Sequence, residues 1–235
     1  AWSWTFGDGG SSTAQNPSHI YNNAGTYTVS LTVSNGGGSD NETKTSYITA
    51  VPAPSAFTDD FNRADSTILG NGWTEVQGDL KILSNEVRNE AIKIYHMAIQ
   101  SSLSGTYQDV ACDFARTTTN GAPRFGVMLR YQDANNYYYF WRSTGGTTRL
   151  YISKVVNGVK TDLTSVSQGN PTVNVLFNLE GIADGTTLKL KLNGVEKLSI
   201  TDTTYSSGSC GIQFGSTSNT DSHRADNFSA TIGSL

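Results

Sequence analysis

The sequence predicts an all-β fold, and three observations support this. Only 15% of the 235 residues are Asp, Glu, Lys or Arg, while Gly, Ser, Thr and Asn are abundant, which is typical of strands and turns. Short stretches with alternating apolar and polar residues recur along the chain. Asn-Gly and Asp-Gly pairs separate several of these stretches, and such pairs are the strongest short signal of an antiparallel hairpin.

Charge and hydropathy exclude two classes of function. The formal net charge is −4, and no segment has the clustered excess of Lys and Arg that phosphate neutralisation requires. No run approaches the roughly 18 to 20 apolar residues of a membrane helix. We therefore expect neither nucleic-acid binding nor membrane insertion.

The first 51 residues form one β unit. Residues 26–33, TYTVSLTV, alternate strictly and predict a half-buried antiparallel strand. Turns are expected at 22–25 and 35–38, and a second strand at 43–51. A compact unit therefore ends near residue 51.

This first unit carries a specific set of motifs. The segment WTFGDGG at residues 4–10 is followed by PSHIY at 17–21 and by AGTYTVSLTV at 24–33. These motifs, at this spacing, resemble the second half of a PKD (polycystic kidney disease type) domain. The resemblance implies a partial immunoglobulin-like sandwich over 1–51 whose opening strands are absent. We expect such a half-sandwich to be loosely ordered or to be completed by a neighbouring molecule, because it leaves strand edges and apolar faces uncovered.

A short proline-containing linker at 52–56 precedes the second unit, residues 57–235. About ten alternating stretches in this unit predict a two-sheet antiparallel β-sandwich, or jelly roll. They are 80–83, 108–116, 124–131, 137–142, 148–156, 173–179, 186–192, 196–200, 208–214 and 224–232.

Several segments of the second unit, in their order and spacing, are similar to those of a known family of domains. They include FTDDFNRADSTILGNGWTEVQG, GVMLRYQDANNYYYFWR and RADNFSATI. The unit is similar to the concanavalin A-like, laminin-G-type jelly rolls attached to secreted bacterial and archaeal polysaccharide-degrading enzymes. The resemblance implies a carbohydrate-binding-module-like domain, although one fold of this kind hosts many functions.

In the resembled family the first and last strands of the jelly roll lie side by side, which would bring Asp60 and Asp226 together. Two adjacent carboxylates repel unless a cation or proton intervenes, and calcium accepts several carboxylate and carbonyl oxygens. We expect a structural calcium ion there, with Asp59, Asn62 and Asn85 as weaker candidate ligands. The alternative is that these side chains only cap turns.

The segment GVMLRYQDANNYYYFWR, residues 126–142, predicts a hairpin that is the most probable binding surface of the sequence. With a five-residue connection, Leu129 would face Tyr139 and Val127 would face Trp141. We then expect these four side chains to point into the core and Arg130, Tyr138 and Arg142 to point outward. A register shift of one residue would reverse the assignment.

Sugars are bound by aromatic faces and by polar side chains that bond their hydroxyl groups. The candidate ligand-binding residues are Arg130, Tyr138, Arg142, Arg149, Tyr95, His96 and Arg124. Their arginines suit an acidic, carboxylated polysaccharide, because the guanidinium group pairs with carboxylate. The alternative is that the aromatic residues belong to the core and the arginines to a solvated face.

The two cysteines, Cys112 and Cys210, lie in strand-like contexts where both side chains would point inward. They form either a disulfide or two buried free thiols. Two thiols without C-x-x-C spacing do not support a zinc site.

The sequence gives little sign of a catalytic centre. The glutamates form no paired arrangement for glycoside hydrolysis on a single strand, and nucleophile-elbow, zinc-helix and phosphate-loop motifs are absent. We therefore expect a non-catalytic polysaccharide-binding fragment of a larger secreted or cell-surface protein, which targets or presents a linked enzyme. The alternatives are a structural or adhesive subunit that assembles by strand addition, as a homo-oligomer through the incomplete first unit, and a lyase or hydrolase on the jelly roll.

Overall fold

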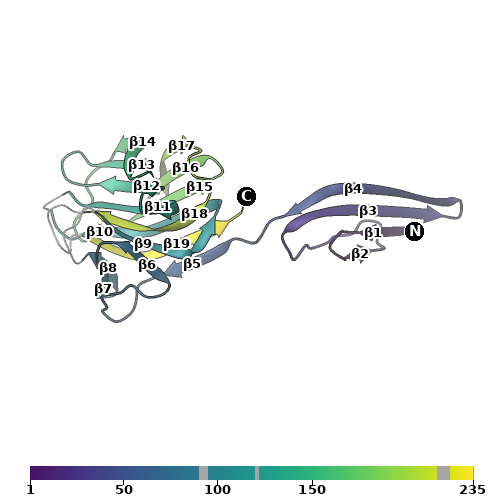
Figure 1. The fold of residues 1–235 in the computed structure, drawn as a ribbon, viewed down its shortest axis with the longest axis horizontal. Helices are drawn as coiled ribbons and strands as arrows, with labels where there is room; N and C mark the ends of the chain where they lie inside the picture. The colour runs from purple at the N-terminus through teal and green to yellow at the C-terminus, as the bar shows by residue number, and fades with distance from the viewer. Residues whose placement is uncertain (90–94, 120–121, 216–222, 235) are drawn as a thin grey trace. The chain divides into compact units, whose positions relative to one another are not determined.

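A computed structural model describes residues 1–89, 95–119, 122–215 and 223–234 (Figure 1). The chain divides into two compact units, residues 1–53 and 54–235, and each is described by itself. All the regular elements of the described residues are β-strands, which confirms the predicted all-β fold. Within these ranges there is no helix that could cross a membrane.

The first unit is a single antiparallel sheet with the strand order β2-β1-β3-β4. Its longest strands contain the two segments expected from the sequence, and β4 begins five residues earlier than expected because it pairs with β3 along the whole hairpin. The strands are β1 (Trp2–Thr5), β2 (Ser11–Ser12), β3 (Gly25–Asn35) and β4 (Gly38–Ala50).

The residues of the WTFGDGG and PSHIY motifs pack against one another in the first unit. The ring of His19 stacks on Phe6 at 4.1 Å, and its Nε2 lies 2.7 Å from a carboxylate oxygen of Asp8. The hydroxyl of Tyr21 donates to the carbonyl of Phe6. Gly7 has a φ of 83°, and a Cβ there would lie 2.5 Å from the carbonyl oxygen of Thr28. The motif residues therefore fix the tight turn after β1.

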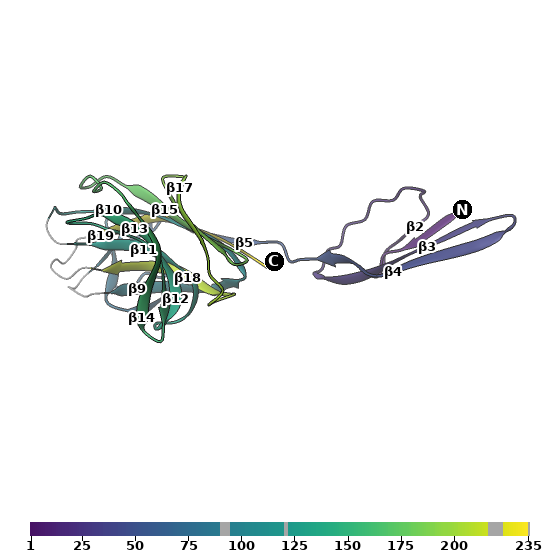
Figure 2. The same ribbon diagram turned by 90° about the horizontal axis from the view of Figure 1, so that it is seen from above.

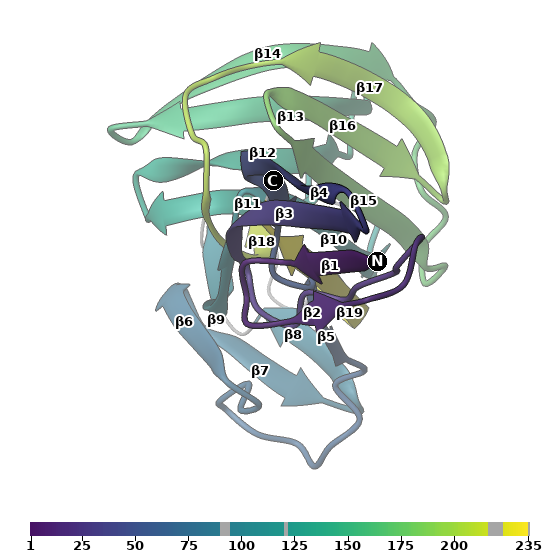
Figure 3. The ribbon, with the colours of Figure 1, turned by 90° about the vertical axis from the view of Figure 1, so that its right-hand side faces the viewer.

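The second unit is a sandwich of two antiparallel sheets, seen edge-on in Figure 2 and end-on in Figure 3. The eight-stranded sheet has the order β17-β16-β15-β10-β19-β8-β7, with β5 also paired to β19, and the seven-stranded sheet has the order β14-β13-β12-β11-β18-β9-β6. The strands are β5 (Ser55–Asp59), β6 (Trp73–Gln77), β7 (Leu80–Leu83), β8 (Glu86–Asn89), β9 (His96–Gly105), β10 (Tyr107–Arg116), β11 (Arg124–Asp133), β12 (Asn136–Ser143), β13 (Arg149–Val156), β14 (Val159–Ser167), β15 (Phe177–Asp184), β16 (Thr187–Leu192), β17 (Val195–Thr201), β18 (Gly208–Gly215) and β19 (His223–Gly233).

The first and last strands of the sandwich lie side by side. β5 pairs antiparallel with β19, with Asp59 opposite Phe228 and Ser55 opposite Ile232. β5 therefore starts inside the segment 52–56 that the sequence suggested as linker, because Ser55 is already paired.

The space between the sheets holds one continuous apolar core. Aromatic side chains fill one end of it, where Phe114 lies 6.0 Å from Phe125 and 5.8 Å from Phe214 between ring centres. Cys112 and Cys210 are buried in this core from opposite sheets and are both free thiols. Of the two alternatives, the disulfide is therefore wrong and the pair of buried free thiols is correct. Burial raises the pKa of both thiols.

The hairpin of β11 and β12 differs from the predicted register by one residue. Leu129 lies opposite Tyr138, and Val127 lies opposite Phe140. The reason is a bulge after Leu129, where Arg130 adopts a φ of 49°. Consequently Tyr138 points into the core, while Tyr139 and Trp141 lie on the opposite face of the sheet. The predicted orientation of these aromatic residues is wrong.

Candidate functional site

The seven-stranded sheet carries a second apolar cluster on the face that points away from the core, which we call the outer face. These side chains alternate along the strands with those of the core, as the period of two requires. The cluster consists of Met97, Ile99, Met128, Tyr131, Tyr137, Tyr139, Trp141 and Val155, with Val76, Tyr95 and Tyr151 packed against it. The eight cluster residues are buried, whereas the three residues packed against them are partly exposed.

Three parallel rings form the centre of the outer face. Tyr139 and Trp141 are stacked at 5.6 Å between ring centres, and Trp141 and Tyr151 at 4.2 Å. Gly126 on the neighbouring strand makes room for them, because a Cβ there would lie 2.5 Å from the Tyr139 ring and 2.7 Å from the Cβ of Trp141. Trp141 is 4% exposed, whereas Tyr151 at the end of the stack is partly exposed.

Two cations flank the stack. The Nζ of Lys160 lies 4.4 Å from the centre of the Trp141 ring, and the guanidinium carbon of Arg124 lies 5.6 Å from it. Both distances fall within the range of a cation–π interaction. Lys160 is also held by Asp162, at 2.7 Å. The outer face therefore combines aromatic surface with charged donors, as sugar-binding surfaces do.

Arg149 extends this surface at the start of β13. Its guanidinium donates to the hydroxyls of Ser165 and Ser167 on β14, and its backbone N–H donates to the hydroxyl of Ser143. Neutral hydroxyl groups fix the side chain without cancelling its charge. Arg149 is thus a positioned cation, and its role in ligand binding stays a prediction.

Gln213 lies beneath the same face and is fully buried. Within the described part of the chain, neither its Nε2 nor its Oε1 has a hydrogen-bond partner. Burial raises the pKa of the Tyr137 hydroxyl, and the nearby Gln213 amide acts in the opposite direction. A buried amide with this much unused capacity is uncommon.

Arg130 and Tyr138 do not belong to the outer face, so their predicted outward position is wrong. Arg130 is 1% exposed, and it donates to the carbonyls of Tyr205, Thr106 and Gly185, each at 2.7 Å. The hydroxyl of Tyr138 donates to Asp202 at 2.6 Å from inside the core. Arg130 therefore joins three loops at one end of the sandwich.

Arg142 and His96 are also buried, contrary to the expectation that they would be available to a ligand. Arg142 is 4% exposed and its guanidinium lies 4.5 Å from the centre of the Phe177 ring. His96 is fully buried, and its Nδ1 accepts from the backbone N–H of Asp79. Of the predicted ligand-binding residues, Arg124, Arg149 and Tyr95 lie at the outer face and are partly exposed.

The predicted calcium ligands meet where β5 pairs with β19. Asp59 is not available, because its carboxylate receives a bidentate pair from Arg63, at 2.7 and 3.0 Å, and the indole N–H of Trp73 at 2.8 Å. Asp60 and Asp226 remain, and burial together with Glu86, Asp113 and Asp60 raises the pKa of Asp226.

The other residues of this corner support a metal less directly. The backbone N–H of Asn62 donates to Asp60, which is the turn-capping alternative. Asn85 has a φ of 62° between β7 and β8. Among the described residues no three His, Cys, Asp or Glu side chains are grouped to hold an ion.

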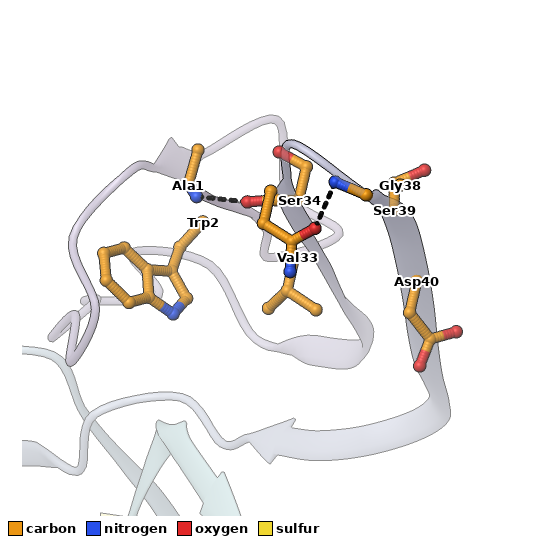
Figure 4. Close-up of a pocket in the computed structure, with 9 residues that line it drawn as sticks. Ala1, Trp2, Val33, Ser34, Gly38, Ser39 and Asp40 are labelled. Carbon is orange, nitrogen blue, oxygen red and sulfur yellow. Dashed lines mark hydrogen bonds between the residues drawn. The ribbon is translucent and has the colours of Figure 1, made fainter.

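A further hollow lies on the first unit (Figure 4). A cavity of about 560 Å³ opens beside Trp2, Val33 and Asp40, and the ammonium group of Ala1 donates to the carbonyl of Ser34 at its rim (Figure 4). The same sheet face continues into a cavity of about 310 Å³ lined by Trp4, Val29, Leu31, Glu42, Lys44 and Tyr47. This apolar face is uncovered within the first unit.

Sequence reasoning missed three residues of the outer face. Tyr151 could have been found, because Arg149, Tyr151 and Ser153 alternate on one side of β13. Lys160 and Gln213 gave no such signal, because their role depends on pairing between strands that are distant in the sequence.

Comparisons with known proteins separate the two units. The family profile for the PKD domain matches residues 1–50. A stretch of 42 residues is 50% identical to the collagenase ColA of Bacillus cereus, and it covers 18% of this chain and 4% of the collagenase. The PKD resemblance of the first unit is thus confirmed.

Solved structures similar to the chain are sandwiches of the same kind. The carbohydrate-binding module CBM66 of Bacillus subtilis has a TM-score of 0.55 at 20% identity, covering 69% of this chain and 94% of the module. A β-glucanase of Bacillus licheniformis has a TM-score of 0.54 at 13% identity, covering 75% and 97%. The lumenal domain of VIP36 in its Ca²⁺- and Man3GlcNAc-bound form has a TM-score of 0.52 at 12% identity, covering 68% and 83%. At these identities the likeness shows the fold alone, which confirms the predicted jelly roll.

Proposed function

We propose that the chain is a non-catalytic, polysaccharide-binding part of a larger secreted or cell-surface protein, and that it binds glycan on the outer face of the seven-stranded sheet. The single observation that carries this proposal is the stack of Tyr139, Trp141 and Tyr151 between two cations. The similarity in fold to a carbohydrate-binding module supports it.

The residues of the outer face would make different contacts with a bound sugar. Tyr151 presents an aromatic surface to the apolar C–H groups of a sugar ring, and Trp141 holds it parallel from behind. Arg124, Lys160 and Tyr95 supply donors for hydroxyl groups. Binding would hold a polymer near a linked enzyme and so raise its effective concentration.

Affinity electrophoresis in gels containing different polysaccharides tests the proposal. Tyr151→Ala is expected to weaken the affinity measured by retardation about five- to thirtyfold, because loss of one stacking contact costs about 1 to 2 kcal/mol. Tyr107→Ala on the eight-stranded sheet is the matched control, since Tyr107 is likewise a partly exposed tyrosine on a strand. Equal retardation of Tyr151→Ala and the parent chain in every retarding gel would contradict the proposal.

We also propose a calcium ion at the corner between β5 and β19, held by two side chains. Asp60 and Asp226 would hold the ion, and backbone carbonyl oxygens would complete its coordination. The ion would supply the positive charge that two neighbouring carboxylates lack, so its role would be structural. VIP36, whose domain has a similar fold, was solved with Ca²⁺.

A second candidate function is that of a structural or adhesive subunit. The observation that favours it is the uncovered apolar face of the first unit, where Trp2 is 39% exposed and Tyr47 is 58% exposed. A second molecule could cover this face and extend the sheet at its edge. This role is compatible with glycan binding by the second unit.

A further inference from the structure

We infer that the glycan is anionic, and that its carboxylate or sulfate groups are bound by four arginines at one end of the sandwich. The inference rests on the proposed function, because two of these arginines, Arg124 and Arg149, lie at the outer face beside the aromatic stack. The four residues, which we call the arginine end, are Arg116, Arg124, Arg142 and Arg149.

The sheet topology brings the four arginines to the same end. β10 and β12 finish there with Arg116 and Arg142, while β11 and β13 begin there with Arg124 and Arg149. Arg142 lies opposite Phe125 on one side and opposite Leu150 on the other, so it is between the strands of Arg124 and Arg149. Arg116 is near enough to contribute to the lowered pKa of Arg142.

None of these arginines forms an ion pair in the described ranges of the chain. Three other arginines do: Arg63 pairs with Asp59 at 2.7 Å, and Arg88 and Arg224 pair with Glu86 at 3.0 and 3.5 Å. The protein as a whole carries a formal net charge of −4. Among the described residues, therefore, no acidic side chain neutralises the positive charge of the arginine end.

Arg142 is the buried member of the group. At 4% exposure its guanidinium donates to the carbonyl of Gly169, and its Nε, like that of Arg116, is buried with no hydrogen-bond partner among the described residues. Burial, and then repulsion by Arg116, lowers the pKa of Arg142 to about 10, so the group is still charged at neutral pH. A buried cation without a counter-ion is costly, and an anion arriving at this end would offset that cost.

The chemistry of the group selects the ligand. Guanidinium groups bind carboxylates and sulfates through paired N–H donors in one plane. Arg124 lies 5.6 Å from the Trp141 ring centre, so a sugar on the outer face would place its acidic substituent among arginines. Arg116, Arg124 and Arg149 are all partly exposed, and Arg124 and Arg149, which lie at the outer face, would contact the substituent directly.

Matched polymer pairs test the inference with the whole chain. Isothermal titration calorimetry would compare polygalacturonate with its fully methyl-esterified form, and dextran sulfate with dextran. We expect at least one anionic polymer to bind tenfold or more tightly than its neutral partner, and more weakly as salt increases. The double variant Arg124→Gln/Arg149→Gln should lose most of this difference, whereas Lys189→Gln should keep it, and thermal unfolding checks that each variant is folded.

The outcomes separate the inference from the proposed function. Equal binding of the charged and neutral polymers, abolished by Tyr151→Ala, would overturn the anionic inference and leave glycan binding at the outer face intact. The same holds if the double variant keeps the full preference for the anionic polymer. Absence of binding to any polysaccharide would overturn the proposed function, and the inference would fall with it.

Discussion

At the scale of single residues, Asp109 carries an energetic cost that its sequence context hides. It lies on the outward side of β10 beside Glu180 and Lys191, and burial followed by the charge of Glu180 raises its pKa to about 6. The folded-state pKa is thus above the ordinary value of 3.8. The stability that protonated Asp109 provides is complete below pH 4 and is lost as the pH rises through 6.

Asp109→Asn should therefore stabilise the second unit at pH 7 and have little effect at pH 4. The expected gain is about 1 to 2 kcal/mol, after allowance for solvent screening of a half-buried group. Urea unfolding at both pH values measures it. Asp184→Asn is the control on the same sheet, because Asp184 is exposed, and an equal gain in the control would refute the assignment.

Arg130 has a structural role, although its residue type suggested a role in ligand binding. Its three hydrogen bonds to loop carbonyls make it a structural cation rather than a ligand contact. Arg130→Met should destabilise the second unit by about 2 to 4 kcal/mol, because it leaves three partly buried carbonyls unpaired. Chemical unfolding measures the loss, with Arg149→Met expected to cost less than about 1 kcal/mol; similar costs for both would contradict the distinction.

At the scale of elements, alternation and turn residues predicted most strands, but not the register of every hairpin. The expected strands at 80–83, 124–131 and 224–232 all lie within observed ones. The predicted register of the β11–β12 hairpin is wrong by one residue, because of a bulge at Arg130, whose side chain bonds to loops that are distant in the sequence. Local sequence cannot carry that information.

The candidate site was predictable to the same limited degree. Arg124 and Arg149 were found because they begin strands of strong alternation. Tyr138 was placed on the wrong face by the register error, and Lys160 was missed because it reaches Trp141 only through the pairing of β13 with β14. Strand propensity and the alternation of apolar residues describe each strand by itself, whereas the site depends on which strands pair and in which register.

Gly126 is the element-scale test of the aromatic stack. A Cβ at this position would lie 2.3 Å from the carbonyl oxygen of Phe140 and would displace the rings of Tyr139 and Trp141. Gly126→Ala should cost about 1 to 3 kcal/mol of stability by overpacking, change the near-ultraviolet circular dichroism and weaken glycan binding. Gly169→Ala, where a Cβ meets nothing within 4 Å, is the control. An unchanged aromatic spectrum in Gly126→Ala would show that the stack does not depend on this close approach.

At the scale of the second unit, the pairing of β5 with β19 joins the beginning of the sandwich to its end, and calcium would strengthen that junction. Added Ca²⁺ should raise the melting temperature and a chelator should lower it, because an ion that binds only the folded state stabilises it. Asp226→Asn should abolish the response, while Asp65→Asn should keep it. If neither calcium nor the chelator changes the melting temperature, a structural ion at this corner is excluded.

At the scale of the whole chain, the uncovered face of the first unit predicts self-association. Trp2 and Val33 lie exposed side by side across β1 and β3, and such a contiguous apolar face is usually covered in soluble proteins. Sedimentation velocity over a hundredfold range of concentration should show dimers or larger species. Trp2→Ser with Val33→Thr should shift the population to monomer, because the apolar area available for burial falls. As a matched control, Ile68→Ser removes an exposed apolar side chain of the second unit and should leave the association unchanged; a monomer at all concentrations would rule out this face as a self-assembly surface.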